Sequence, residues 1–314
     1  MAEQLAGVFW QGKHLAGSNL MGANLFQANL ERANLDRVDL RWANLENVYA
    51  REVSARHANL RDCWAQRINM EKACLEGADL TGARFPFAFL YEADLSYTHL
   101  EGAQLIGVNL NNAKLLGAKL INTDLQGAQL RNVNMAGAVL IGCNFGDATL
   151  ADVNLIAAQI MGGNFHGAGL ERVNLSQAII EGVDLSGASI IQIDPTGPGM
   201  KMIDLCGMNL DHIDMKGRDL SNRNFQGTSL IGVNFFEADL SKASFRDANL
   251  MSANLKRSNI IGACFDYSIL TGADLSEITE FEGATFNGAN WWHARTGPEG
   301  KFKNYLMKIY PKSF

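Results

Sequence analysis

The chain has 314 residues, of which 27 are Lys or Arg and 33 are Asp or Glu, so its formal net charge is −6. Apolar residues make up 47% of the sequence, which excludes a disordered chain, and 31 glycines are too few for a collagen. No run of 18 apolar residues is present to cross a membrane, and residues 1–13 lack the apolar core of a secretory signal. Five cysteines, an odd number, fit a reducing compartment better than a disulfide scaffold, so we expect a cytoplasmic protein.

The sequence repeats itself every five residues. From Leu15 to Leu275 every residue whose number is divisible by five is a candidate central position, and 34 of these 53 positions are Leu. A small residue, mostly Ala or Val, stands two places before the centre, and Asn or Asp often stands between the two. A period of five fits neither an α-helix nor a single strand, so it predicts a coil whose sides are each five residues long.

The two apolar residues of each repeat should point into the coil, while the Asn or Asp fits a corner where its side chain bonds the backbone. One repeat cannot bury its apolar residues alone, so the coils must stack with a strand-like spacing of ~4.8 Å. All but one of the central phenylalanines are separated by multiples of four repeats, and Phe235 is the exception. We therefore predict square coils of four repeats, about 13 in all. The phenylalanines that keep this interval are Phe85, Phe145, Phe165, Phe225, Phe245 and Phe265.

These repeats resemble the pentapeptide-repeat proteins, whose consensus A(D/N)LXX is matched by the strings ANL at 23–25, 28–30 and 33–35. The resemblance covers residues 15–290 and implies an all-β fold, a right-handed quadrilateral β-helix. Members of that family share a fold but differ in function. Some protect DNA gyrase from inhibitors by mimicking duplex DNA, and others are regulators, secreted effectors or thylakoid-lumen proteins. The resemblance therefore implies the fold and leaves the function open.

The repeat predicts three segments along the chain. Residues 1–14 should form an N-terminal cap, residues 15–290 the β-helix, and residues 291–314 a C-terminal cap segment. One extra residue enters after Leu275, and apolar residues recur at helical spacing over 301–310. We expect this short helix to cover the last coil, because a solenoid needs caps at its ends. A homodimer formed through the same segment is the alternative.

The repeat is interrupted by a loop at residues 191–202, where Pro195 and Pro198 cannot donate ladder hydrogen bonds. Shortly after this loop, two inward small positions carry arginine. We expect each guanidinium to pair with nearby carboxylates or to leave the core, because an unpaired buried charge is very costly. Two interpretations of these arginines follow: a packing defect held together by ion pairs, or an anion pocket beneath the loop. The residues of that candidate pocket are Asp194, Pro195, Arg218 and Arg223.

If equivalent residues of every fourth repeat are vertical neighbours, the outer surface divides into columns. Most charged columns alternate in sign, which stabilises neighbouring strands, as in Arg32, Glu52, Lys72 and Glu92. One column instead stacks two arginines beside tryptophans, a composition typical of protein interfaces, with Asp62 as the neutralising group if the cluster is only structural. Another column is apolar and points outward. The candidate partner-binding residues are Arg41, Trp42, Arg61, Trp64, Ile121, Ile141 and Met161.

The sequence carries no signature of catalysis. Its six histidines stand far apart, its cysteines lack metal-site spacing, and no phosphate-binding or nucleophile motif occurs in a credible context. We therefore expect no catalytic residues, no metal and no cofactor, and no membrane partner. The leading interpretation is a non-enzymatic protein–protein interaction rod, a regulator or scaffold whose partner the sequence does not name.

The alternative function is a DNA mimic that protects a type II topoisomerase from inhibitors. A mimic should present an acidic surface along a continuous path, but arginines interrupt the first third of this chain. Direct nucleic-acid binding is disfavoured further, because the net charge is negative and phosphates require a basic surface.

Overall fold

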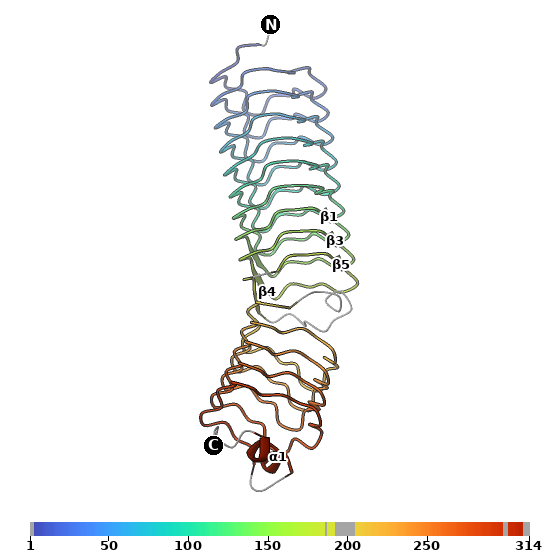
Figure 1. The fold of residues 1–314 in the computed structure, drawn as a ribbon. Helices are drawn as coiled ribbons and strands as arrows, with labels where there is room; N and C mark the ends of the chain where they lie inside the picture. Colours follow the sequence, from blue (N-terminus) through green and yellow to red (C-terminus); the bar gives the residue numbers. More distant parts are fainter. Residues whose placement is uncertain (1–2, 186, 192–204, 298–300, 310–314) are drawn as a thin grey trace. The chain divides into compact units, whose positions relative to one another are not determined.

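The structure is a computed structural model that describes residues 3–185, 187–191, 205–297 and 301–309. The chain divides into two compact units, Met1–Asp184 and Leu185–Phe314, and each unit is a stack of coils (Figure 1). Apart from Ile191, the predicted loop at 191–202 lies outside the described residues, and so do Asp194 and Pro195 of the candidate anion pocket.

Each coil has four sides of five residues. In the first unit Asn24 pairs in parallel with Asn44, and the same pairing continues from each coil to the next. Two hydrogen bonds carry this pair: Leu25 N donates to Asn44 O at 2.8 Å, and Asn44 N donates to Ala23 O at 2.9 Å. The second unit has the same parallel pairing. The predicted fold class, a right-handed quadrilateral β-helix, is confirmed.

A tight turn joins one side to the next, and its geometry explains the polar positions of the repeat. Ala28 N donates to Leu25 O at 2.9 Å, which closes a four-residue turn. The third residue of this turn, Gln27, has a φ of 56°, a left-handed conformation in which glycine is favoured, and glycine is frequent at this position. Asn24 Oδ1 accepts a hydrogen bond from Phe26 N at 3.2 Å. The corner role predicted for Asn and Asp is therefore confirmed.

Within the described residues, six short stretches of the ladder are continuous strands. They are β1 (Val139–Ile141), β2 (Thr149–Ala151), β3 (Gln159–Met161), β4 (Gly169–Glu171), β5 (Ile179–Glu181) and β6 (Ser189–Ile191). β3 lies between β1 and β5 in a parallel sheet, and β2 pairs in parallel with β4. Figure 1 shows β1, β3 and β5 above one another on one side of the first unit.

The core of each unit is the apolar interior of its coils. Leu130 and Ala128, the central and the small residue of one repeat, are both fully buried, as the pattern predicts. Three central positions hold alanine, Ala50, Ala55 and Ala65, and these are buried too. Larger inward neighbours compensate for the missing volume, as expected for a core that conserves total volume. These buried neighbours are Val48, Val53, Cys63 and Ile68.

Phenylalanine rings from consecutive coils stack inside the β-helix. In the first unit the ring centroids of Phe145 and Phe165 lie 4.7 Å apart. In the second unit Phe245 stacks on Phe225 at 4.9 Å and on Phe265 at 4.8 Å, with nearly parallel ring planes. Offset stacking of this kind stabilises a core beyond the area that it buries. The stacks confirm that four repeats complete one coil.

The repeat begins earlier in the chain than the sequence predicts. Gln4, Phe9 and His14 already pair with Asn24, Asn29 and Asn34 of the next coil, so these residues form sides of a coil. The sequence assigns residues 1–14 to an N-terminal cap, because the regular repeat starts at Leu15 and a solenoid needs a cap at its end. Backbone pairing with the next coil does not require the regular repeat.

The C-terminal end carries the only helix among the described residues, α1 (Lys301–Ile309). Figure 1 shows α1 at the end of the second unit, where Phe302 and Leu306 are buried. Tyr305 Oη donates a hydrogen bond to Ala284 O at 2.8 Å, which fixes the helix to a late coil. This helix is too short to span a membrane, and no described helix meets that requirement. A homodimer through this segment stays a prediction.

We expect Gly107→Ala to destabilise the first unit more than Gly102→Ala does. Both glycines have positive φ, 62° and 66°, so alanine is strained at each by ~1–2 kcal/mol. A Cβ on Gly107 would also lie 2.7 Å from the Phe87 ring, whereas a Cβ on Gly102 would meet nothing within 4 Å. The free energies of unfolding from chemical denaturation give the difference. Equal losses would show that the Phe87 ring does not pack on the next coil.

Candidate functional site

The structure places both predicted partner-binding columns on one corner of the first unit. Trp42 N donates to Arg61 O at 3.1 Å, which stacks consecutive coils at this corner. Further along the same column Ile141 of β1 lies opposite Met161 of β3. We call this column the Arg41 corner; its residues, in order, are Arg41, Arg61, Thr81, Glu101, Ile121, Ile141 and Met161.

The two arginines of the Arg41 corner are paired with carboxylates. Arg41 donates from Nε to Asp39 Oδ1 at 2.9 Å and from Nη2 to Asp39 Oδ2 at 2.7 Å. This contact lowers the pKa of the Asp39 carboxyl from its ordinary value. Arg61 Nη1 lies 3.3 Å from Asp79 Oδ2. The arginines are therefore not a stack of unpaired like charges, and their partners come from the neighbouring side of the coil instead of from Asp62.

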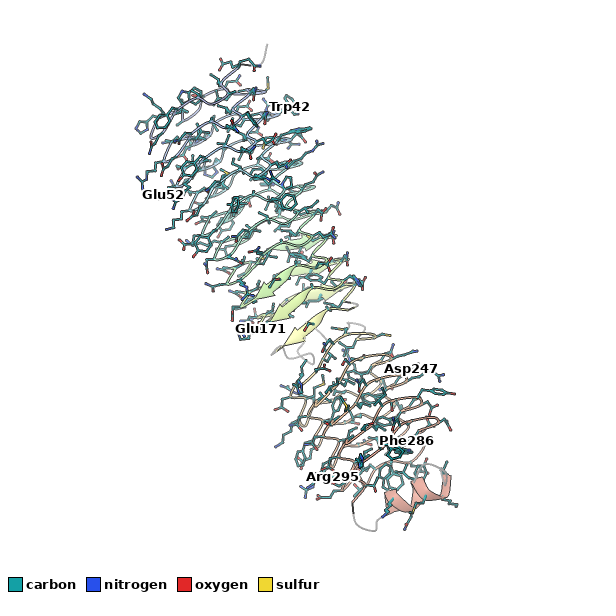
Figure 2. The ribbon with its side chains drawn as sticks, turned by 90° about the vertical axis from the view of Figure 1, so that its left-hand side faces the viewer. Trp42, Glu52, Glu171, Asp247, Phe286 and Arg295 are labelled. Atoms are coloured by element: carbon teal, nitrogen blue, oxygen red, sulfur yellow. The ribbon has the colours of Figure 1, made fainter. Side chains whose placement is uncertain are left out.

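Two tryptophans beside these arginines are largely exposed. Trp42 and Trp64 each expose 57% of their surface. The Arg84 guanidinium lies 4.6 Å from the Trp64 ring centroid, and that of Arg41 lies 5.6 Å from the Trp42 centroid, both within cation–π range. Figure 2 shows Trp42 on the opposite side of the first unit from Glu52. The cations hold the indoles in place without covering them.

Two further exposed aromatic residues lie in the same coil as Arg84, and sequence reasoning missed them. Phe87 and Phe89 expose 52% and 50% of their surface. They follow Arg84 in the same coil, so they extend the surface around the next corner. The available signal was the string PFAFLY at 86–91, which places large apolar residues at outward positions. Trp42, Trp64, Arg84, Phe87 and Phe89 together are called the aromatic surface.

The apolar part of the Arg41 corner is less exposed than its sequence pattern indicates. Ile121, Ile141 and Met161 are half-buried. Glu181 of β5 lies opposite Met161, so the apolar run ends in a carboxylate. Neighbouring coils cover part of each side chain, because a residue at a corner stacks on the equivalent residue of the next coil. The part of these residues in partner binding stays a prediction.

Arg218 and Arg223 are not enclosed in the core of the second unit. Arg218 is exposed and Arg223 is half-buried, although both stand at positions that the repeat directs inward. This agrees with the expectation that each guanidinium pairs or leaves the core, because a long guanidinium side chain can leave the coil and keep its charge near water. With Asp194 and Pro195 outside the described residues, the anion pocket stays a prediction.

In the described part of the chain, neither the metal-ligating residue types nor the Cys143 thiol forms a reactive centre. No group of three or more His, Cys, Asp or Glu residues there could hold a metal ion. Burial raises the pKa of Cys143 to about 12, so this thiol stays protonated at neutral pH.

The second unit has one further feature, a polar surface depression of about 170 Å³. The Arg257 side chain that lines it is hydrogen-bonded to Glu277 at 2.7 Å and to Glu237 at 3.5 Å.

A sequence model of one family, described as pentapeptide repeats, matches the chain in eight copies. Together the copies cover more than half of the chain, at residues 4–36, 33–71, 73–112, 88–127, 98–137, 128–167, 213–251 and 238–276. The chain belongs to the pentapeptide-repeat family.

Several solved structures are similar to this pentapeptide-repeat protein. HetL, involved in heterocyst differentiation regulation in the cyanobacterium Nostoc sp. strain PCC 7120, is 22% identical over 93% of this chain and 87% of its own, with a TM-score of 0.28. Rfr23 from the cyanobacterium Cyanothece 51142 is 33% identical over 35% of this chain and 62% of its own, with a TM-score of 0.24. A pentapeptide-repeat protein of the Arabidopsis thaliana thylakoid lumen is 28% identical over 38% of this chain and 84% of its own, also with a TM-score of 0.24. A comparison with curated proteins found no match. TM-scores of this size carry no function over to this chain.

Proposed function

We propose that this pentapeptide-repeat protein is a non-enzymatic binding module that holds a partner protein on the aromatic surface of its first unit. The observation that supports this is the exposure of Trp42, Trp64, Phe87 and Phe89, each of which leaves half or more of its surface open. Aromatic residues and arginine carry much of the binding energy in protein interfaces. A fully covered aromatic side chain buries ~150–250 Å², so each of these half-covered rings would lose about half of that area to a partner. Four of them supply the centre of an interface.

The aromatic surface is also held in place before a partner arrives. Arg84 lies 4.6 Å from the Trp64 ring centroid, and Arg41 is tied to Asp39 by two hydrogen bonds. Ordering a long side chain on binding costs ~0.5–1.5 kcal/mol, and these contacts reduce that cost. The β-helix beneath them is rigid, since each coil is hydrogen-bonded to the next.

The ion pairs of the first unit weigh against the DNA-mimic alternative. A surface that imitates phosphates needs carboxylates without bound cations along its length. Here three glutamates in neighbouring columns contact arginines, at distances of 2.8, 3.1 and 3.8 Å. They are Glu52, Glu71 and Glu76. We therefore expect no protection of a type II topoisomerase from a quinolone in a supercoiling assay.

We expect the double variant Trp42→Ala/Trp64→Ala to lose its partner while keeping its fold. A partner captured from an extract of the native host is identified, purified and titrated against each variant. Loss of two central aromatic contacts should weaken binding at least tenfold, because each contact contributes ~1 kcal/mol or more. Both rings are largely exposed, so the melting temperature should change little.

Tyr267→Ala is the matched control for this test. Tyr267 exposes 54% of its surface and lies 4.8 Å from the Arg246 guanidinium, but it belongs to the second unit. Binding should therefore survive its loss. If the tryptophan double variant binds as tightly as the wild type, or if Tyr267→Ala weakens binding equally, the aromatic surface is not the interface.

A further inference from the structure

One outward column of the first unit alternates aromatic and asparagine residues. Each pairs in parallel with the next, from Phe9 to Asn29 and onward with one residue from each coil. The column belongs to the side of the coil that includes Phe89 of the aromatic surface. We call it the aromatic column; its residues are Phe9, Asn29, Tyr49, Asn69, Phe89 and Asn109.

The aromatic rings of this column are available to a ligand. Phe9 exposes 67% of its surface, Phe89 50% and Tyr49 36%. They recur at every second coil, so with ~4.8 Å between coils their backbone positions lie ~9.6 Å apart along the stacking direction. The column is therefore a ladder of apolar contacts with one fixed repeat distance.

That repeat distance matches one kind of extended peptide. A polyproline II helix has three residues per turn and rises ~3.1 Å per residue, so the same side of it returns every ~9.3 Å. A strand presents the same face every ~6.6 Å. An α-helix presents the same face after seven residues, a rise of ~10.5 Å. A strand face therefore returns at ~6.6 and ~13.2 Å and misses the middle ring at ~9.6 Å, whereas the α-helix falls ~1.8 Å out of step over two intervals.

The asparagines between the rings suit the backbone of such a peptide. Asn29 Oδ1 accepts from Glu31 N at 3.0 Å, and Asn69 Oδ1 accepts from Glu71 N at 3.1 Å, which fixes both amides. Asn109 is held in the same way by Asn111 N at 3.0 Å. In the described part of the chain, the Nδ2 atoms of these three asparagines donate to no protein group. A polyproline II backbone makes no internal hydrogen bonds, so its carbonyl oxygens can accept from these amides.

Tyr49 adds a hydroxyl donor in the middle of the column. Its ring exposes 36% of its surface. A phenol O–H can donate a hydrogen bond to a peptide carbonyl. Aromatic-lined surfaces are known to bind proline-rich peptides in the polyproline II conformation.

The charges at the corner that follows the column in each coil disfavour a strongly charged ligand. Arg51 Nε lies 3.1 Å from Glu71, and Lys72 Nζ lies 3.5 Å from Glu92, so these charges already have partners. A strongly charged peptide or a nucleic acid would have to displace them. Complementarity therefore favours a segment whose contacts are apolar rings and backbone carbonyls.

We infer that the aromatic column binds a proline-rich segment of a partner protein, in the polyproline II conformation and running along the stacking direction. The three rings of the column match two turns of the peptide helix, so every third residue of the peptide contacts a ring. The sequence pattern of such a peptide is P-x-x-P-x-x-P. The inference rests on the proposed function, because it names the chemistry of the partner segment that reaches from the aromatic surface onto this column.

The test is a titration of the full chain with a fluorescein-labelled, uncharged peptide of the pattern P-x-x-P-x-x-P, followed by anisotropy. We expect the wild-type chain to bind the peptide saturably. The variant Phe9→Ala/Phe89→Ala should bind it at least tenfold more weakly. The wild-type chain should also bind more weakly to a peptide whose three prolines are replaced by alanine. Phe89→Ala alone should give a partial loss. Tyr267→Ala, an exposed aromatic of the second unit, is the control and should bind like the wild type.

Two results would overturn the inference. One is the absence of saturable binding by the wild-type chain; the other is binding that Phe89→Ala and the double variant leave unchanged. A linear β-linked oligosaccharide is titrated in parallel, and binding of the sugar without the peptide would assign the column to a polysaccharide instead. If the peptide fails to bind while Trp42→Ala/Trp64→Ala still loses its captured partner, the polyproline inference falls and the proposed function stands.

Discussion

Leu130→Asp is expected to lower the free energy of unfolding of the first unit by more than about 4 kcal/mol. Leu130 is fully buried, and so are Leu110 and Leu150, the residues that stack on it from the coils on either side. A carboxylate at this position is therefore surrounded by apolar side chains. Burying it unpaired, or protonating it to avoid the charge, costs several kcal/mol in addition to the lost leucine packing. Chemical denaturation followed by circular dichroism measures the change.

Gln126→Asp is the matched control, since it places the same new residue four positions away on the outside of the same coil. Gln126 is exposed, and its backbone N–H bonds to Asp124 Oδ1 at 3.1 Å, which a new side chain does not disturb. A surface change of this kind is usually within ~0.5 kcal/mol. Equal destabilisation by the two substitutions would contradict the inward and outward assignment on which the whole fold rests.

The fold was predictable because the repeat ties each residue number to a place in the coil. The period of five defines a side, and the four-repeat interval of the phenylalanines defines a complete turn. The pairing of Asn24 with Asn44 and the stack of Phe225 on Phe245 are direct consequences of those two periods. The same two periods predict that the larger residues next to the central alanines, such as Val48 beside Ala50, also point inward.

The ion pairs of the Arg41 corner could not be read from the same arithmetic. Column analysis compares equivalent residues of consecutive coils, whereas Arg41 reaches back to Asp39 in its own coil and Arg61 reaches forward to Asp79, which does not stand in its column. Both contacts join a corner residue to the side that precedes the corner. The period fixes the backbone of each coil, but the direction of a long side chain depends on its rotamer, which the repeat does not determine.

The same limit explains Arg218 and the overlooked phenylalanines. The repeat assigns Arg218 an inward position, yet the residue is exposed, because the energy of keeping a charge near water outweighs the positional preference. Phe87 and Phe89 stand at outward positions and are half exposed, as the repeat assigns them. An analysis of charges alone passes over them, although a group of large apolar residues at outward positions marks a candidate binding surface.

Phe245→Ala is expected to destabilise the second unit by ~3–5 kcal/mol. The ring is fully buried between Phe225 and Phe265, at centroid distances of 4.9 and 4.8 Å. It also meets Phe235 edge-on, at 5.7 Å and 73°. Removing it leaves a cavity in the middle of a rigid ladder that cannot collapse without breaking backbone pairs, and it removes aromatic contacts worth ~0.5–1.5 kcal/mol each.

Two controls separate the ring stack from the loss of any phenylalanine. Phe245→Leu introduces the residue most frequent at central positions and should recover most of the stability, because it refills the volume without the stacking. Phe236→Ala removes a half-buried outward ring that lies 5.0 Å from Lys216 Nζ, so it should cost ~1 kcal/mol or less. Denaturant titrations of the three variants give the order. If Phe245→Ala is no more destabilising than Phe236→Ala, the phenylalanine ladder does not hold the second unit together, and the stability of its coils must come from their backbone pairing and leucines.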